Sequence, residues 1–220
     1  VIINEERPQL TKHLATRFKE KIGQNVNLLG EVVLGNEEAD HRYHHYLEAL
    51  ESPDINYISV KISGIYAQTH ALNYEESFPE LVSRMSALYQ KAIDFPYTDE
   101  DGIKRSKFIN LDMEEYKDAH FTLRLFKAVL NLPQFKNYSA GIVVQAYLPD
   151  AYDFQTELLE FAKARVDGGG APIKMRLVKG CNLEMETVIS SLKGWPNPIR
   201  PSKTEVDANY LCLLERGLMP

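Results

Sequence analysis

Five short apolar runs alternate with longer amphipathic segments along this chain. The runs are rich in valine, isoleucine and leucine, and each is bounded by polar or turn-forming residues. Between them, apolar side chains such as Leu81, Met85 and Leu88 recur three and four positions apart, which is the period of an amphipathic helix. The alternation predicts repeated strand–helix units and a parallel sheet. The expected strands are 26–29, 57–62, 108–111, 140–147 and 173–178.

The segments between the strands predict six helices and two prominent loops. Because the strands are continuous apolar runs, we expect them to be buried on both faces. The glycines at 168–170 follow a helix and precede a strand, which is typical of a helix C-terminus rather than of a phosphate site. The loops are the charged segment 96–107 and the proline-rich segment 194–203. The expected helices are 37–50, 74–93, 114–130, 153–166, 183–192 and 207–216.

Two parallel architectures fit this order of elements, an open flavodoxin-like sheet and a TIM-type barrel. Polar residues stand at the end of strand after strand, as expected where the strands of a barrel converge on one site. The chain has no Gly-rich dinucleotide or phosphate fingerprint of a doubly wound sheet. We therefore predict an α/β fold of the (β/α)8 TIM type, here a partial barrel with about five βα units. Residues 1–24 form a helical lead-in, and residues 25–220 form the partial barrel.

Composition narrows the possible partners and the compartment. The formal net charge of −6 argues against nucleic acid as a partner for this segment, and no apolar run approaches 18 residues. The two cysteines form no CxxC pair, which favours a reduced cytosolic compartment. His41, His44 and His45 have no metalloprotease context, so we expect a solvated helix face and no metal. The absence of an initial Met indicates a piece of a longer polypeptide.

Two predicted strands carry a charged or amide side chain where an apolar one would be expected. Lys61 lies in the run VKIS, and a buried lysine needs a partner or a task. It either pairs internally with a carboxylate such as Asp112 or serves as an anion-binding or Schiff-base lysine. Gln145 lies in VVQAY, where its amide either is satisfied within the core or matches the edge of a flavin-like or uracil-like ring.

The fifth strand carries two cations beside a glycine. Arg176 and Lys179 flank its last residues, and Gly180 permits close approach of the backbone. This arrangement suits an anionic or electron-rich ligand, although a pair of salt bridges at the mouth of a barrel would also explain it.

Several spaced motifs resemble one family. From about Asn25 to Arg216 the chain is similar to the barrel of the proline dehydrogenase family, and the later motifs resemble its bacterial bifunctional form, proline utilization A. The motifs are YISVKISGIYAQ, FINLDMEEY, AGIVVQAYLPDA, PIKMRLVKG, KGCNLEME, GWP and KTEVDANY.

The resemblance implies a cofactor, a substrate and partners. FAD would take a hydride from the ring carbon next to the nitrogen of L-proline, giving pyrroline-5-carboxylate as the first step of proline catabolism to glutamate. A membrane quinone would then accept the electrons. A fused or downstream pyrroline-5-carboxylate dehydrogenase domain is expected, as are a cytoplasmic location, at times against the inner membrane surface, and homo-oligomers.

The resemblance also implies roles for individual residues. Lys61 corresponds to a lysine near the substrate carboxylate, Asp112 to an aspartate that orients substrate-binding arginines, and Glu31 to a glutamate that gates the site. More residues correspond to cofactor contacts of the family. Gln145 and Arg176 correspond to residues at the flavin ring. The remaining cofactor contacts are Lys179, Gly180, Cys181 and Lys203.

The sequence departs from the family at defined places. Cys181-Asn182-Leu183 replaces alanine-tyrosine-tryptophan, and Glu205 stands where a histidine is common, which puts two cofactor contacts in question. Strands six to eight and the closing helix with its paired arginines are absent, so this chain alone is expected to be inactive. Two alternatives stay open, an aldolase-type Schiff-base lyase using Lys61 or Lys179 and a non-catalytic apo fragment.

Overall fold

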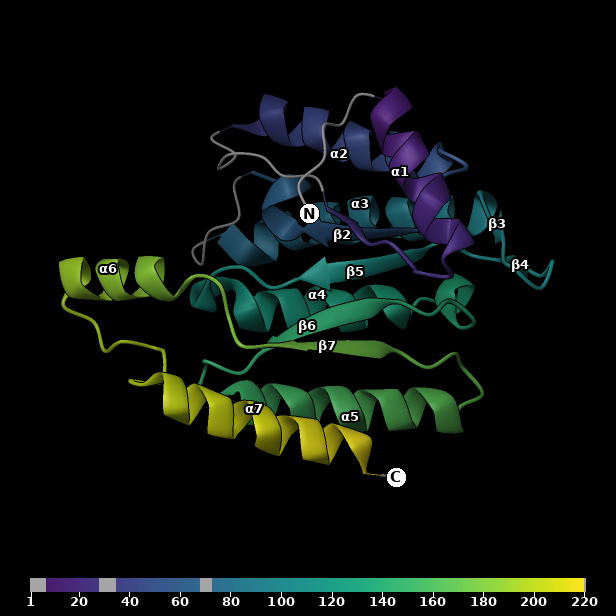
Figure 1. The fold of residues 1–220 in the computed structure, drawn as a ribbon. Coiled ribbons are helices and arrows are strands. Elements are labelled where there is room, and N and C mark those ends of the chain that lie inside the picture. Colours follow the sequence, from purple (N-terminus) through teal and green to yellow (C-terminus); the bar gives the residue numbers. More distant parts are fainter. Residues whose placement is uncertain (1–6, 28–34, 68–72, 220) are drawn as a thin grey trace. The chain divides into compact units, whose positions relative to one another are not determined.

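The computed structural model describes residues 7–27, 35–67 and 73–219. Five strands form one parallel sheet whose spatial order follows the sequence, β1-β2-β5-β6-β7 (Figure 1). An open flavodoxin-like sheet places its first strand inside the sheet, so the sequential order agrees with the predicted TIM-type arrangement. The strands of the sheet are β1 (Val26–Asn27), β2 (Tyr57–Lys61), β5 (Phe108–Asp112), β6 (Gly141–Gln145) and β7 (Lys174–Val178).

Seven helices accompany these strands in the described part of the chain. Two predicted boundaries are wrong: the helix expected from residue 114 begins at Ala119, after a short 3-10 turn at Tyr116–Asp118, and the last helix begins at Lys203. Among the described residues, no helix combines the length and the apolar character needed to cross a bilayer. The helices are α1 (Arg7–Lys19), α2 (Asn36–Glu51), α3 (Tyr74–Asp94), α4 (Ala119–Leu130), α5 (Ala151–Asp167), α6 (Leu183–Lys193) and α7 (Lys203–Leu218).

The chain divides into two compact units, the first of which comprises the described residues up to 67 together with 79–110. Its core contains Leu50 of α2, Val60 of β2 and Leu88 of α3, all fully buried. The segment expected to be a loop at 96–107 contains a two-stranded antiparallel ladder, β3 (Tyr97–Thr98) with β4 (Lys104–Arg105). Strands this short do not show the alternation of apolar and polar residues by which a sequence predicts a strand.

The second unit comprises residues 73–78 and 111–219 and contains β6, β7 and the last four helices. All five residues of β6 are buried, as predicted for a strand covered on both faces. The same expectation is wrong for β7, whose residues are half-exposed or exposed because it is the last strand in the sheet order. Helices α5 and α7 lie side by side, and Gln155 donates to the carbonyl of Leu213 at 2.7 Å (Figure 1).

Lys107 is a buried lysine in the first unit. It is 2% exposed, and its ammonium donates a hydrogen bond to the carbonyl of Ser52, the residue that ends α2. Burial lowers the pKa of Lys107 to about 8, and the negative charge of Asp54 only partly opposes this effect. A buried cation therefore closes the C-terminus of α2, where the helix dipole favours positive charge.

This lowered pKa predicts a pH dependence of stability. Between about pH 8 and the ordinary lysine pKa of about 10.4, the unfolded chain binds more protons than the folded chain, so stability should rise with pH. Lys107→Met should flatten the rise, whereas Lys104→Met, at an exposed site, should not. Chemical unfolding from pH 7 to 10.5 measures the slope, and equal slopes for both variants would contradict the assignment.

Candidate functional site

An ion pair joins the end of β5 to β7 in the second unit. Asp112 ends β5 and is 5% exposed, and its Oδ1 lies 2.7 Å from Nη2 of Arg176 in β7. Asp112 and Arg176 were both predicted as site residues, and the structure brings them together. The pairing also agrees with the alternative interpretation of Arg176 as part of a salt bridge. The Nε of Arg176 is buried and has no hydrogen-bond partner within the described residues.

Gln145 ends β6, the strand between β5 and β7 in the sheet order. Its Nε2 donates to the carbonyl of Glu114 at 3.2 Å, while its Oε1 is buried and has no partner in the described parts of the chain. The register of the two strands places Gln145 opposite Val178, two residues beyond Arg176. The end of β6 thus offers a buried acceptor, and the middle of β7 offers a buried donor.

Buried polar atoms without a partner cost about 1–3 kcal/mol each, and a bound ligand could satisfy the two on the neighbouring strands β6 and β7. A ligand that satisfies both must present an N–H and an acceptor on one edge. A flavin ring has both on its pyrimidine side, so the residues present fit the predicted cofactor.

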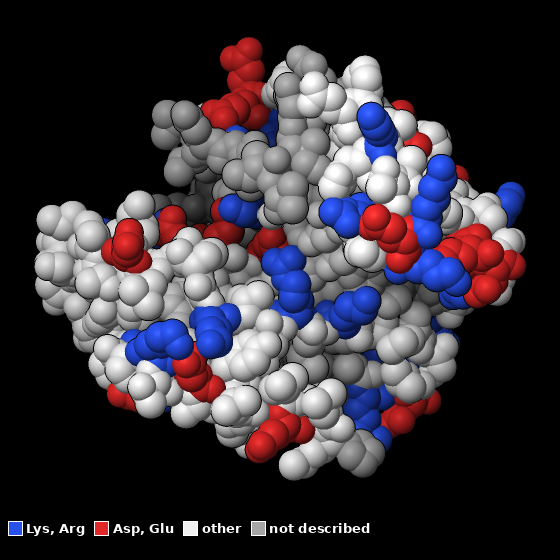
Figure 2. Space-filling view, in the orientation of Figure 1, with Lys and Arg blue, Asp and Glu red and all other residues white. Residues whose placement is uncertain are grey.

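A cavity of about 500 Å³ lies beside the carboxyl ends of β6 and β7. The loop that follows β7 and the start of α7 both line it. Lys179, Arg200 and Lys203 line it, and Asp207 pairs with both lysines, at 2.6 Å from Nζ of Lys179 and 2.7 Å from Nζ of Lys203. Hydrogen bonds from the two lysines hold the pKa of Asp207 below its ordinary value. Figure 2 shows basic side chains gathered around acidic ones over the start of α7. The cavity is therefore suited to an anionic group.

The start of α7 adds to this suitability. Ser202 caps the helix by accepting a hydrogen bond from the backbone N–H of Glu205 at 3.2 Å, and the Glu205 side chain lies 3.3 Å from the Ser202 hydroxyl. Glu205, the residue that departs from the family pattern, therefore contacts the N-cap serine through both its backbone N–H and its side chain. The N-terminus of a 16-residue helix also contributes partial positive charge at the cavity.

Tyr147 contacts the loop that carries Lys179 and Gly180. The backbone N–H of Tyr147 donates to the carbonyl of Lys179 at 2.7 Å, and its own carbonyl accepts from the N–H of Arg200 at 2.8 Å. Gly180 has φ +132, and a Cβ at that position would collide with the Tyr147 ring. Glycine is thus required at 180 for both the backbone conformation and the close approach.

Three further residues were predicted for the site: Lys61, Glu31 and Cys181. Lys61 is the half-buried last residue of β2 and belongs to the first unit. Glu31 lies outside the described residues. Cys181 is exposed directly after Gly180, and its Sγ is 3.6 Å from Oδ1 of Asn182.

Sequence reasoning missed three residues of the site. Tyr147 was noted only as a polar residue at a strand end, although its hydroxyl is buried without a partner among the described residues. Arg200 and Asp207 come from the loop before α7 and from α7 itself. The spacing of Lys203 and Asp207, four apart at a helix start, was the available signal for the ion pair.

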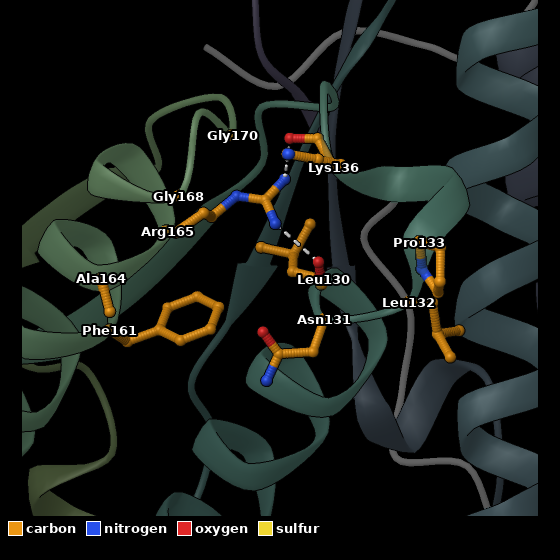
Figure 3. A pocket seen from close by; sticks show the side chains of 10 residues that line it. All are labelled: Leu130, Asn131, Leu132, Pro133, Lys136, Phe161, Ala164, Arg165, Gly168 and Gly170. Carbon is orange, nitrogen blue, oxygen red and sulfur yellow. Dashed lines mark hydrogen bonds between the residues drawn. The ribbon is translucent and has the colours of Figure 1, made fainter.

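A second cavity, of about 370 Å³, lies at the opposite end of β6 and β7 and is structural. Figure 3 shows the guanidinium of Arg165 pointing toward the carbonyls of Leu130 and Lys136. Arg165 also donates to the carbonyls of Phe135, Tyr138 and Ala171, which uses its donors on the chain itself. Gly168 ends α5 beside it and Gly169 has φ +73, which confirms the prediction of a helix C-terminus at 168–170.

The fold and the site define a class: an α/β domain of sequentially ordered parallel strands with charged and amide side chains gathered toward their carboxyl ends. Similarity to known proteins then identifies the family. Residues 10–219 match the sequence model for proline dehydrogenase, and the chain belongs to the proline dehydrogenase family. A search of curated proteins found no match.

Solved structures of proline utilization A resemble this chain. The protein from Corynebacterium freiburgense is 41% identical with a TM-score of 0.91, covering 100% of this chain and 22% of that one. The protein from Bdellovibrio bacteriovorus, inactivated by N-propargylglycine, is 32% identical with a TM-score of 0.80, covering 93% of this chain and 22% of that one. This chain thus spans about a fifth of their length. The similarities give no support to a Schiff-base lyase.

The close approach at Gly180 leads to a prediction. Gly180→Ala should displace the loop that follows β7, because the new Cβ has no room above Tyr147. Gly194→Ala is the matched control, since Gly194 also has positive φ (+64) but nothing within 4 Å. Backbone strain alone costs each variant about 1 kcal/mol. Thermal unfolding should show the larger loss for Gly180→Ala, and equal losses would show that the collision is relieved without cost.

Proposed function

We propose that this chain belongs to an FAD-dependent enzyme that oxidises L-proline to pyrroline-5-carboxylate. The observation that carries the proposal is that two buried atoms, Oε1 of Gln145 and Nε of Arg176, have no hydrogen-bond partner within the described residues. Family membership supports the substrate, since the matched family is proline dehydrogenase. FAD, when bound, supplies the acceptor for a hydride leaving the proline ring carbon next to nitrogen.

The residues on the cofactor side have separable tasks. Gln145 accepts a hydrogen bond at the ring edge, and Arg176 donates one while Asp112 holds its guanidinium in place. A cation fixed there stabilises negative charge on an electron-rich ring. Lys179, Lys203 and the start of α7 offer positive charge to the phosphates of the cofactor.

Leu183 and Cys181 make the proposed cofactor site differ from that of other family members. Leu183 lines the cavity and is 47% exposed, so an apolar contact stands where other members place an aromatic ring. Cys181 adds an exposed thiol next to the loop glycine. We expect weaker stacking on the adenine end of the cofactor than a tryptophan would give.

On the substrate side, Lys61 binds the proline carboxylate and Glu31 gates the site. The support is the resemblance of VKIS and the following segment to the family motif. Asp112 pairs with Arg176, so its proposed role is extended from the substrate arginines to the cofactor cation. Electrons leave to a membrane quinone, and a pyrroline-5-carboxylate dehydrogenase domain consumes the product, in a cytoplasmic oligomer that meets the inner membrane surface.

The cofactor site is tested by two conservative variants. Arg176→Lys keeps the pairing with Asp112 but loses Nε, and Gln145→Met removes the acceptor. Each should weaken FAD binding about tenfold to a hundredfold, the effect of one lost charge-assisted or buried hydrogen bond. Arg124→Lys and Gln90→Met, both at exposed positions, are the matched controls.

Fluorescence titration with FAD and proline-dependent dye reduction in the intact natural protein measure both outcomes. Unchanged affinity in both site variants would contradict the proposed ring contacts. No flavin binding and no proline oxidation by the unaltered protein would overturn the function itself.

The substrate site is tested by Lys61→Ala. Loss of a charged contact to the carboxylate should raise KM for proline about tenfold to a hundredfold and leave FAD affinity unchanged. Lys91→Ala is the control, because Lys91 pairs with Glu51 on the surface of α2 and α3. An unchanged KM would favour the alternative interpretation, in which Lys61 is part of a structural ion pair.

A further inference from the structure

Helix α6 is held to the second unit by polar contacts. It follows the loop of residues 179–182 directly and lies beyond the carboxyl ends of β6 and β7 (Figure 1). Only two of its residues are buried, Glu186 and Ser190, and both are polar. Among its large apolar side chains, Ile189 is half-buried, and four are between 47% and 81% exposed: Leu183, Met185, Val188 and Leu192. The apolar burial that anchors most helices is therefore small here.

Glu186 makes the contact that docks this helix. The residue is 6% exposed, and Oε1 accepts a hydrogen bond from the backbone N–H of Tyr116 at 2.6 Å. Tyr116 begins the 3-10 turn that follows β5, four residues after Asp112. Its hydroxyl donates to Asp150, at the start of α5, at 2.6 Å, which fixes the turn independently. The bond from Glu186 thus joins the turn after β5 to the helix after β7.

The surroundings of Glu186 make this contact sensitive to charge. Burial raises the pKa of Glu186, the Tyr116 N–H opposes the rise, and the carboxylates of Glu115 and Asp118 add to it, while Lys117 lowers it. The Tyr147 hydroxyl lies in the same field, since burial and then the charge of Glu186 raise its pKa. An ionised carboxylate is therefore costly here, and a neutral acceptor would bind at least as well.

We propose that Glu186 is a positioning residue that docks α6 on the turn after β5 and thereby fixes the loop of Lys179, Gly180 and Cys181. The argument is geometric: the loop has α6 at one end and β7 at the other, and β7 is already held by its pairing with β6. With Glu186 docked, both ends of the loop are fixed. With the contact broken, the α6 end loses its bond to the turn after β5 and keeps the weaker one that Asn197 Nδ2 donates to Oγ1 of Thr187 at 3.3 Å. The consequence for flavin rests on the proposed function, whereas the docking does not.

Three substitutions separate the acceptor from its charge. Glu186→Gln keeps a carbonyl acceptor and should leave α6 docked. Glu186→Ala removes the acceptor and should release it. Glu184→Ala is the matched control, in the same turn of the helix but exposed, and should change nothing.

The donor is tested by a second pair at Tyr116. Tyr116→Pro removes the backbone N–H at the first position of a turn, where proline is tolerated, and Glu115 before it already has the extended backbone that proline requires (φ −78, ψ 151). Tyr116→Phe removes only the hydroxyl. Only the proline variant should release α6 as Glu186→Ala does.

Hydrogen exchange with mass spectrometry on the intact natural protein gives a readout that does not depend on flavin. Amides of residues 186–193 should lose protection about tenfold to a hundredfold in Glu186→Ala and Tyr116→Pro, with α5 unchanged. Full protection of α6 in both variants would overturn the docking role. Loss of α5 protection in Glu186→Ala, with Glu186→Gln equally affected, would also overturn it, because the effect would then be global.

FAD affinity in the same variants tests the consequence. We expect binding to weaken several-fold in Glu186→Ala and to be retained in Glu186→Gln. Released α6 with unchanged FAD affinity would refute the positioning of the loop. An unaltered protein that binds no flavin would instead refute the proposed function, while the exchange result would still decide whether Glu186 docks α6.

Discussion

The ion pair between Asp112 and Arg176 is the interaction on which the site depends. The two residues lie in β5 and β7, and β6 lies between those strands. Two strand spacings are about 10 Å, so the arginine side chain must extend across β6 to reach its partner. Removing Arg176 would take the cation away from the buried Asp112 carboxylate, whereas the Arg176 side chain itself is 38% exposed. The sheet thus holds a guanidinium over the strand that carries Gln145.

The other features of the site follow from this crossing. Arg176 uses one nitrogen on Asp112 and keeps Nε unpaired, while Gln145 uses its amide N on the carbonyl of Glu114 and keeps Oε1 unpaired. Folding alone would favour pairing such atoms, and their retention on neighbouring strands favours a ligand with a complementary edge. The lysines around Asp207 would provide charge for the distal part of the proposed cofactor.

The sequence predicted most of the sheet and the centre of the site, because continuous apolar runs and polar residues at their ends are local patterns. Gln145, Arg176 and Lys179 could be identified this way. Tyr147, Asp207 and Glu186 could not, because their roles arise from contacts between elements distant in sequence. Lys107 lies in a segment that reads as a charged loop, yet it is buried at a helix end. The exposure of β7 depends on its place at the end of the sheet order, which no pattern within the strand reports.

The central claim is that the unpaired groups of Gln145 and Arg176 hold a flavin ring. Denaturing the purified natural protein and identifying the released small molecule by absorbance and mass tests it most directly. The account predicts FAD at about one per chain in the unaltered protein, with much less retained when both groups are removed together in Gln145→Met/Arg176→Lys. Full FAD retention by the double variant, or release of a different cofactor from the unaltered protein, would contradict it.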